Sequence, residues 1–257
     1  MALIPPPTKG RALLFGLNYA GTESELRGCV QDVANIGAYL ERTLRLPTKV
    51  CVDAANTTAM SIVKDLYELA LQSHVESLDF AWIHYSGHGS YVVDRSGDEG
   101  DGRDECLVPS DYATVGMISD DFLERVFRYF NPKTRIVFVC DACHSGTVGD
   151  VKYSWQSPTR CVVENVLCAV RARIITLSGC MDDQTSADAF DVLGDGKYSG
   201  ALTSCLLKVL TSAEGASARN DVFVMLARLT AALQTAGFPQ RPKLCSTYNL
   251  AREKLFF

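Results

Sequence analysis

The stretch RIVFVCDACHSG, residues 135–146, joins an apolar run to a group of reactive side chains. Its first half is rich in β-branched and aromatic residues, as expected of a buried strand. Its second half brings Cys140, Asp141, Cys143 and His144 together before a glycine. In parallel sheets, active sites lie beyond the carboxyl ends of the strands. The stretch therefore predicts a buried strand that ends at a functional site.

Similar apolar runs recur along the chain and alternate with helical patterns. This alternation indicates an α/β architecture, with a mainly parallel central sheet flanked by helices on both faces. We expect a short disordered Pro-containing arm at 1–10 and a single domain over 11–257. The expected strands are 11–18, 49–52, 79–86, 135–140, 173–178 and 243–247, and the expected helices are 26–44, 60–70, 119–130, 199–212 and 220–236.

Local signals suggest where the first two helices begin. Thr22 and Glu25 have the spacing of a capping box ahead of the first helix pattern. Asn56 is a candidate cap for the second helix. The segment 144–170 has no clear pattern and is expected to be irregular.

Composition excludes several classes of function. A net charge of −5 argues against nucleic acid as the main partner. No apolar run approaches the ~20 residues that a membrane span requires, and the first residues do not resemble a signal peptide. Several of the ten cysteines, such as Cys51, Cys140, Cys168 and Cys205, lie in apolar surroundings, as reduced and buried cysteines do. We therefore expect a cytoplasmic protein without disulfides.

Three kinds of chemistry are compatible with the two strand ends around residues 88 and 143. Cys140 and Cys143 form a C-x-x-C pair, as in thiol–disulfide enzymes, although Cys140 closes an apolar strand and is expected to be buried. A zinc site would use these cysteines with His144, or His84 with His88. The spacing of the two histidines suits zinc on a helix, whereas Ser86 and Gly87 between them favour a strand end and a turn.

The third kind of chemistry is a cysteine nucleophile. Cys143 follows strand 135–140 and His88 follows strand 79–86, so adjacent parallel strands would place both side chains above the same edge of the sheet. The backbone N–H groups of Gly89 and Cys143 are candidates for stabilising an oxyanion. His84, inside its strand, and His144 are expected to be packed imidazoles.

These residues carry a family resemblance. The sequence HYSGHG (84–89), followed 55 residues after its second histidine by Cys143 in DACHSG, resembles the caspase-fold peptidases and most closely the type I metacaspases. The segment SGCMDDQTSAD (178–188) is similar to a further metacaspase segment, and the resemblance covers about 11–250. It implies a caspase-like fold and a His88–Cys143 catalytic dyad that cleaves peptides through a thioester. The alternative is a catalytically silent caspase-fold regulatory protein, against which the intact dyad argues.

The resemblance also implies specificity for polypeptide substrates with Arg or Lys at P1. By this resemblance, the S1 pocket is expected to be lined by Cys29, Asp32, Ser86 and Asp141. In the sequence, Cys29 and Asp32 lie one helical turn apart on one face. Two carboxylates at the bottom of a pocket repel each other unless a cation lies between them, which favours a basic side chain.

The segment 94–105 carries six acidic and two basic residues. Its acidic positions follow part of an EF-hand register, but position 6 is Glu99 rather than glycine, so an EF-hand is not expected. The resemblance implies a different Ca²⁺ site, formed by Asp104, Asp120, Asp121 and Asp150. Asp120 and Asp121 also read as acidic residues in the first turn of a helix.

Two further expectations come from the resemblance. Self-cleavage would follow a basic residue, for which Lys197 in GDGKYSG is a candidate. Type I metacaspases are generally monomeric, so we expect a monomer.

Overall fold

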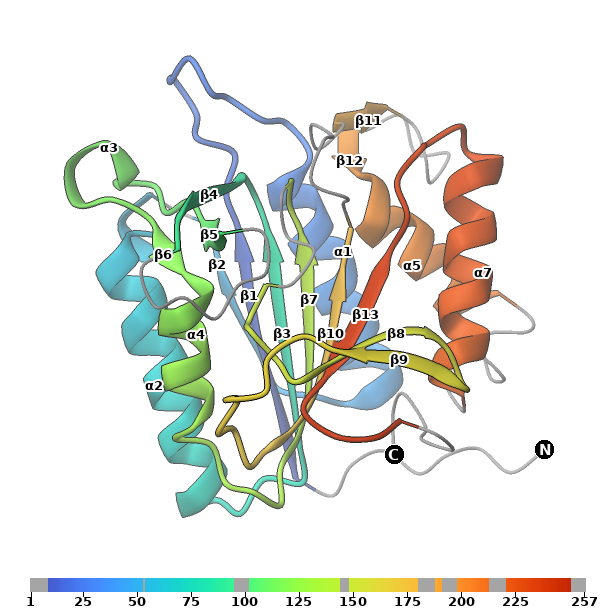
Figure 1. The fold of residues 1–257 in the computed structure, drawn as a ribbon. Helices are drawn as coiled ribbons and strands as arrows, with labels where there is room; N and C mark the ends of the chain where they lie inside the picture. The colour runs from blue at the N-terminus through green and yellow to red at the C-terminus, as the bar shows by residue number, and fades with distance from the viewer. Residues whose placement is uncertain are drawn as a thin grey trace.

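The computed structural model describes residues 9–52, 54–94, 102–143, 148–179, 188–190, 198–212 and 221–250. Its centre is an eight-stranded sheet in the order β2-β1-β3-β7-β10-β13-β8-β9 (Figure 1). The first five strands in this order are parallel, and the last three pair antiparallel. The strands are β1 (Gly10–Gly16), β2 (Thr48–Cys51), β3 (Phe80–Ser86), β7 (Arg135–Asp141), β8 (Tyr153–Ser157), β9 (Arg160–Val163), β10 (Arg173–Ser178) and β13 (Lys243–Ser246).

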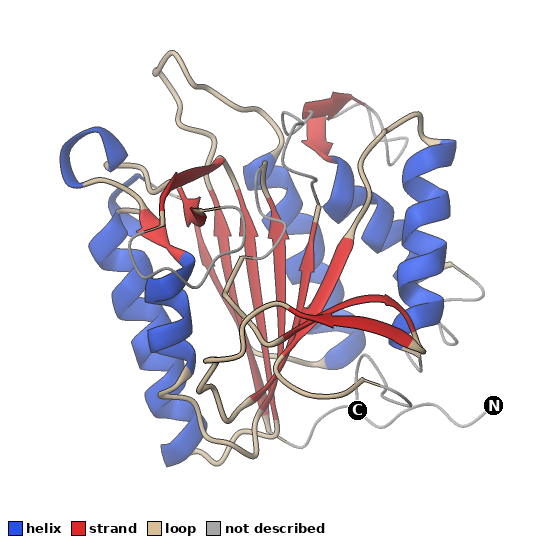
Figure 2. Ribbon diagram, viewed as in Figure 1, coloured by secondary structure: helices blue, strands red, loops and turns tan. Residues whose placement is uncertain are grey.

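Helices cover both faces of the sheet, as predicted (Figure 2). One face carries α1 (Cys29–Tyr39) with its π-helical extension (Leu40–Leu44), α5 (Ala201–Thr211) and α7 (Val222–Thr235). The other face carries α2 (Ala59–Val75) and α4 (Asp120–Phe127). Strand β3 is buried along its whole length and alternates between the two layers, because successive side chains of a strand point to opposite faces. Trp82 packs into the first core and Ile83 into the second.

Smaller elements lie near the carboxyl ends of the parallel strands (Figure 1). A three-stranded sheet contains β4 (Gly89–Val93), β5 (Arg103–Leu107) and β6 (Ile118–Ser119), with the short helix α3 (Tyr112–Val115) between β5 and β6. A two-stranded sheet pairs β11 (Asp188–Phe190) with β12 (Tyr198–Gly200). None of these strands was predicted from the sequence.

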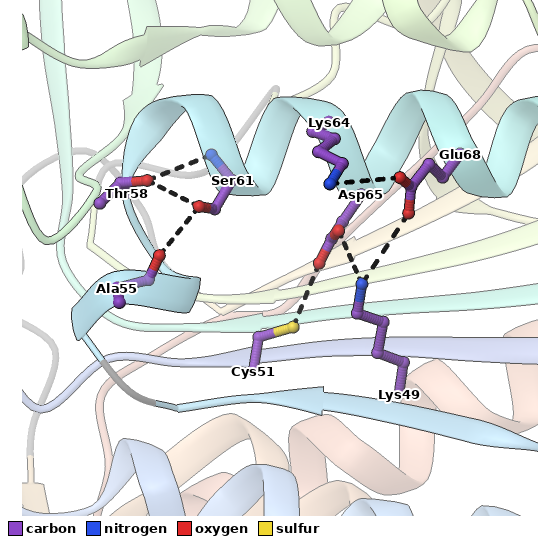
Figure 3. Close-up of polar contacts among 8 residues, drawn as sticks. All are labelled: Lys49, Cys51, Ala55, Thr58, Ser61, Lys64, Asp65 and Glu68. Atoms are coloured by element: carbon purple, nitrogen blue, oxygen red, sulfur yellow. Dashed lines mark hydrogen bonds and ion pairs between the residues drawn. The ribbon is translucent and has the colours of Figure 1, made fainter.

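Three local predictions were wrong. The segment 144–170 is not irregular throughout, because β8 and β9 form a hairpin whose first strand pairs with β13. Helix α1 begins at Cys29 without a side-chain cap, and Glu25 instead accepts a hydrogen bond from Gly21 N, at 2.8 Å. Helix α2 is capped by Thr58, whose side chain accepts from Ser61 N, and not by Asn56 (Figure 3).

A polar contact fastens α2 to the edge strand β2 (Figure 3). Asp65 accepts a hydrogen bond from Lys49 Nζ at 2.7 Å through one oxygen, and from Cys51 Sγ at 3.3 Å through the other. Burial, and then Asp65, raises the pKa of the Cys51 thiol to about 12. Cys51 therefore stays protonated and serves the packing of the helix. In the described part of the chain, no helix is long and apolar enough to cross a membrane.

Candidate active site

The paired strands β3 and β7 end side by side and place the two predicted dyad residues above them. Ser86 pairs with Asp141, and Gly87 N donates to Asp141 O at 3.3 Å. His88 and Cys143 each follow the last paired residue of their strand by two positions.

The backbones that carry this dyad are in direct contact. A Cβ added to Gly89 would overlap with the carbonyl oxygen of Cys143. Only glycine therefore lets the start of β4 lie against the end of the nucleophile's strand. Cys143 is 6% exposed and His88 is half-buried. A peptide bond that reaches this strand end meets a thiol and an imidazole held on touching segments of backbone.

The orientation of His88 is set by a backbone carbonyl. His88 Nε2 lies 2.7 Å from Ser24 O. Because a carbonyl oxygen only accepts hydrogen bonds, Nε2 must carry a proton. Ser24 thus fixes the tautomer and leaves Nδ1 as the ring nitrogen able to exchange a proton, the arrangement that the predicted Cys–His dyad requires.

Two buried tyrosines hold the backbone of His88. Tyr19 Oη accepts from His88 N at 2.9 Å and donates to Val108 O at 2.6 Å, and its ring lies 4.7 Å from the imidazole, centroid to centroid. Tyr85 Oη donates to His88 O at 2.8 Å. Burial raises the pKa of both phenols above the usual value, so both hydroxyls remain donors. Sequence reasoning missed both tyrosines; the position of Tyr85 inside the HYSGHG motif was the one available signal.

The four predicted S1 residues occupy adjoining elements. Cys29 is the first residue of α1, and Asp32 lies one turn further on. Ser86 Oγ donates to Asp32 Oδ2 at 2.6 Å, which joins α1 to the end of β3. All four side chains are buried, with Asp32 1% and Asp141 3% exposed.

Asp32 and Asp141, the two predicted S1 acids, are both hydrogen-bonded to the start of helix α5. Gly200 N donates to Asp32 Oδ1 at 2.8 Å, and Thr203 N donates to Asp141 Oδ2 at 2.8 Å. A Cβ on Gly200 would overlap with Asp141 and lie 2.7 Å from Asp32 Oδ2, so the two acids flank one glycine. The positive end of a helix favours negative charge. Backbone N–H groups therefore stabilise two neighbouring carboxylates here. From the sequence, only a cation bound between the two carboxylates was expected to do so.

Comparisons with known proteins place this geometry in a family. The family model described as the caspase domain of the C14 peptidases matches residues 9–252. The chain belongs to the caspase-domain family. Metacaspase-1B of Aspergillus terreus is 27% identical over 96% of this chain and 77% of its own length. Metacaspase-1 of Mycosarcoma maydis is 28% identical over 96% of this chain and 73% of its own.

A solved structure agrees on the fold. The crystal structure of a Geobacter sulfurreducens protein matches with a TM-score of 0.65 at 24% identity, and the match covers 96% of this chain and 97% of that one. The resemblance to metacaspases and the caspase-like fold are thus confirmed. As a member of the caspase-domain family, the chain is a cysteine-type endopeptidase that acts on polypeptides.

The resemblance to metacaspases also implied a calcium site, and two of its four predicted ligands lie near each other. Asp104 on β5 and Asp120 at the start of α4 are both buried, and Glu105 N donates to Asp120 Oδ2 at 3.1 Å. Burial, and then the charges of Asp120, Asp104 and Glu105, raise the pKa of Cys106 to about 12. These three carboxylates are therefore close enough to act on the Cys106 thiol electrostatically.

The other two predicted calcium ligands lie on different segments, Asp121 in the first turn of α4 and Asp150 in a turn before β8. Asp121 follows Asp120, and its N–H donates to Asp120 Oδ1 at 2.9 Å. Asp150 adopts a left-handed backbone with φ 46° and accepts from Asn165 Nδ2 at 2.6 Å. Carboxylate oxygens are the ligands that Ca²⁺ prefers, so the donors fit the ion chemically. Within the described residues, however, no three acidic, histidine or cysteine side chains are grouped closely enough to hold a metal.

Three other residues named from the sequence, Glu99, His144 and Lys197, lie outside the described residues, as do residues 180–187 of the segment 178–188. Cys140 is fully buried in the core between the sheet and α2 and α4. This is the position expected of a strand residue and not of an exposed redox cysteine.

Proposed function

We propose that this protein is a calcium-dependent cysteine endopeptidase that cleaves after Arg or Lys. The observation that carries the proposal is the pair Asp32 and Asp141. Two buried carboxylates flank Gly200, and one of them, Asp141, is the last residue of β7, two positions before Cys143. A basic P1 side chain is the substrate group that such a pair attracts most strongly.

The reaction follows from the roles of the two dyad residues. The Cys143 thiolate, favoured by a protonated His88, attacks the scissile carbonyl carbon and forms a tetrahedral oxyanion. The N–H groups of Gly89 and Cys143 are assigned to that oxyanion. His88 Nδ1 then protonates the leaving amine, which leaves a thioester on Cys143. Water, deprotonated by His88, hydrolyses the thioester and releases the thiol.

Specificity is attributed to the charge of the S1 acids. A hydrogen bond to a charged group contributes about 1.5–3 kcal/mol, so two such bonds would favour Arg over an uncharged P1 residue by orders of magnitude. An acidic P1 residue would place a third negative charge beside Asp32 and Asp141 and would be rejected. Before the substrate arrives, N–H groups at the start of α5 already donate hydrogen bonds to both carboxylates.

Calcium is assigned to Asp104, Asp120, Asp121 and Asp150. The ion would neutralise these carboxylates and favour an approach of the segment around Asp150 towards the start of α4. Because Asp150 lies seven residues after Cys143 in the chain, such an approach is coupled to the position of the nucleophile.

Two further assignments complete the proposal. We assign the protein to the cytoplasm, since Cys140 and Cys205 are buried among apolar side chains as reduced thiols are. We also assign it as a monomer. Strand β13 is paired on both sides, and the edge strand β9 has only four residues; short edge strands limit pairing between molecules.

The test is hydrolysis of fluorogenic peptides that differ only at P1, with Arg, Lys or Asp before the reporter group. We expect turnover of the Arg and Lys peptides in Ca²⁺, a large loss in EGTA, and no turnover by Cys143→Ala. Faster hydrolysis of the Asp peptide would overturn the assigned specificity. Equal rates in Ca²⁺ and EGTA would overturn the calcium assignment alone.

A further inference from the structure

His84 is a buried titratable residue that the proposed reaction does not use. It lies two residues before Ser86 on β3, so its side chain points to the same face of the sheet, towards α1 and α5. The side chain is 0% exposed, and burial lowers the pKa of the imidazole to about 3. His84 is therefore neutral at physiological pH, with one ring nitrogen that donates and one that accepts.

The donor nitrogen of His84 is identified by its partner. His84 Nε2 lies 3.0 Å from Thr203 Oγ1, and Thr203 Oγ1 donates in turn to Asp141 Oδ2 at 2.7 Å. A hydroxyl has one hydrogen, which this bond uses, so Thr203 can only accept from the imidazole. His84 thus carries its proton on Nε2. Its Nδ1 is buried without a hydrogen-bond partner, a costly arrangement that packing alone would not favour over an apolar residue.

The chain of bonds ends on one oxygen of the S1 acid. Thr203 supplies both its N–H and its hydroxyl to Asp141 Oδ2, at 2.8 and 2.7 Å. The other oxygen, Oδ1, lies 3.6 Å from the position of a Cβ added to Gly179, which follows β10 at the same edge of the sheet. Two bonds to a single oxygen fix the rotation of the carboxylate, so Thr203 determines where Asp141 Oδ1 points.

From this geometry we infer that Thr203, held by His84, is the positioning residue that aims the Asp141 carboxylate at a basic P1 side chain. The inference rests on the proposed function, because it concerns the same S1 acid. His84 directs the Thr203 hydroxyl to the carboxylate, and Thr203 sets the carboxylate's orientation. Neither residue is assigned a contact with the substrate.

The test compares two substrates that differ only in charge. One peptide carries Arg at P1 and the other carries citrulline, which has nearly the same shape and no charge. Thr203→Val removes the hydroxyl and keeps the branched shape, and Thr203→Ser is the matched control that keeps the hydroxyl. The ratio of kcat/KM for Arg to that for citrulline reports the charge contribution of S1.

We expect Thr203→Val to lower this ratio by about tenfold, mainly through KM for the Arg peptide, as the loss of one charge-assisted hydrogen bond predicts. Thr203→Ser should keep the ratio within about twofold of the wild type, since its hydroxyl restores the bond. His84→Phe, which keeps a ring and removes the donor, should lower the ratio in the same direction. This second variant decides the question if Thr203→Val does not fold.

The possible outcomes distinguish the positioning role of Thr203 from the proposed specificity for basic P1 residues. An unchanged ratio in Thr203→Val or His84→Phe, with a clear Arg preference in the wild type, would overturn the positioning role and leave the proposed specificity intact. A wild type without any preference for Arg over citrulline would overturn the proposed specificity and this inference with it. A uniform fall in kcat for both peptides would show a merely structural role and would also overturn the inference.

Discussion

His88 Nε2 is hydrogen-bonded to the carbonyl oxygen of Ser24, 64 residues upstream, at 2.7 Å. A loop before α1 therefore determines which nitrogen of the imidazole carries the proton. Tyr19, in the same loop, accepts a hydrogen bond from the His88 backbone N–H at 2.9 Å, and its ring is tilted by 37° to the imidazole. The conformation of this loop and the chemistry of the dyad are linked through these two contacts.

Tyr19→Phe tests this link. The variant keeps the ring and removes the hydroxyl that accepts from His88 N and donates to Val108 O. We expect kcat to fall about tenfold with little change in KM, because the lost bonds position the acid–base group and do not bind substrate. Tyr91→Phe, at an exposed tyrosine of β4, is the matched control. A normal kcat in Tyr19→Phe, measured by steady-state hydrolysis, would show that the Tyr19 hydroxyl does not position His88.

Gly89→Ala tests the contact between the two dyad segments. The added methyl group would overlap with Cys143 O, so the nucleophile and the imidazole must move apart. We expect kcat/KM to fall about 100-fold or more, since small displacements of reacting groups have effects of this size. Ser90→Ala, the next residue of β4, should remain active. Circular dichroism of both variants checks that the fold persists, and a fully active Gly89→Ala would contradict the contact.

Because His84 is buried in its neutral form, we expect the free energy of unfolding to fall in acid. Its pKa is about 3 in the folded protein and 6.5 in the unfolded chain. Below pH 6.5 the unfolded chain binds a proton that the native protein does not, so the free energy of unfolding falls as pH falls. The expected slope is about 1.4 kcal/mol per pH unit between pH 6.5 and 3.

His84→Phe should lack this contribution. Urea unfolding of the wild type and the variant at pH 7, 6 and 5 measures the difference directly. The variant should gain stability relative to the wild type as pH falls from 6.5, and the difference should stay constant above pH 7. Parallel stability curves at all pH values would show that His84 is not buried in its neutral form.

The contact between α2 and β2 predicts which of two substitutions lowers the free energy of unfolding more. Lys49 is 55% exposed at its side chain, so Lys49→Met should change the free energy of unfolding by less than about 1 kcal/mol. Asp65→Ala leaves the buried Cys51 thiol without its acceptor and should cost about 1–3 kcal/mol. Chemical denaturation gives both values. A larger loss in Lys49→Met than in Asp65→Ala would show that the surface pair, and not the buried acceptor, stabilises the helix.

The strands of the main sheet that carry continuous apolar runs could be predicted from the sequence. Strand β10 has the predicted bounds, and β3 and β7 differ by one residue at one end. The hairpin β8–β9 was missed because Tyr153–Ser157 mixes polar and aromatic residues, and it becomes a strand only by pairing with β13. The β4–β5–β6 sheet was missed for a related reason: its strands are short, and β4 is largely exposed.

The residues of the candidate site that follow the ends of buried strands could be predicted from the sequence. His88 and Cys143 come directly after buried apolar runs, and parallel pairing brings such ends together. The residues that support them were not predictable in this way. Ser24 lies 64 residues from His88 in the sequence, and Thr203 lies 62 residues from Asp141. Ser24 belongs to a loop and Thr203 to the start of a helix, and no local sequence pattern connects either of them to the site.

The most direct test of the central claim is to map the bonds that the protein cuts in a peptide library derived from whole proteins. New N-termini are identified by mass spectrometry after incubation with the wild type in Ca²⁺ and with Cys143→Ala. We expect Arg or Lys immediately before each new N-terminus, and no cleavage by Cys143→Ala. Cleavage after Asp, or the same cleavages by Cys143→Ala, would contradict it.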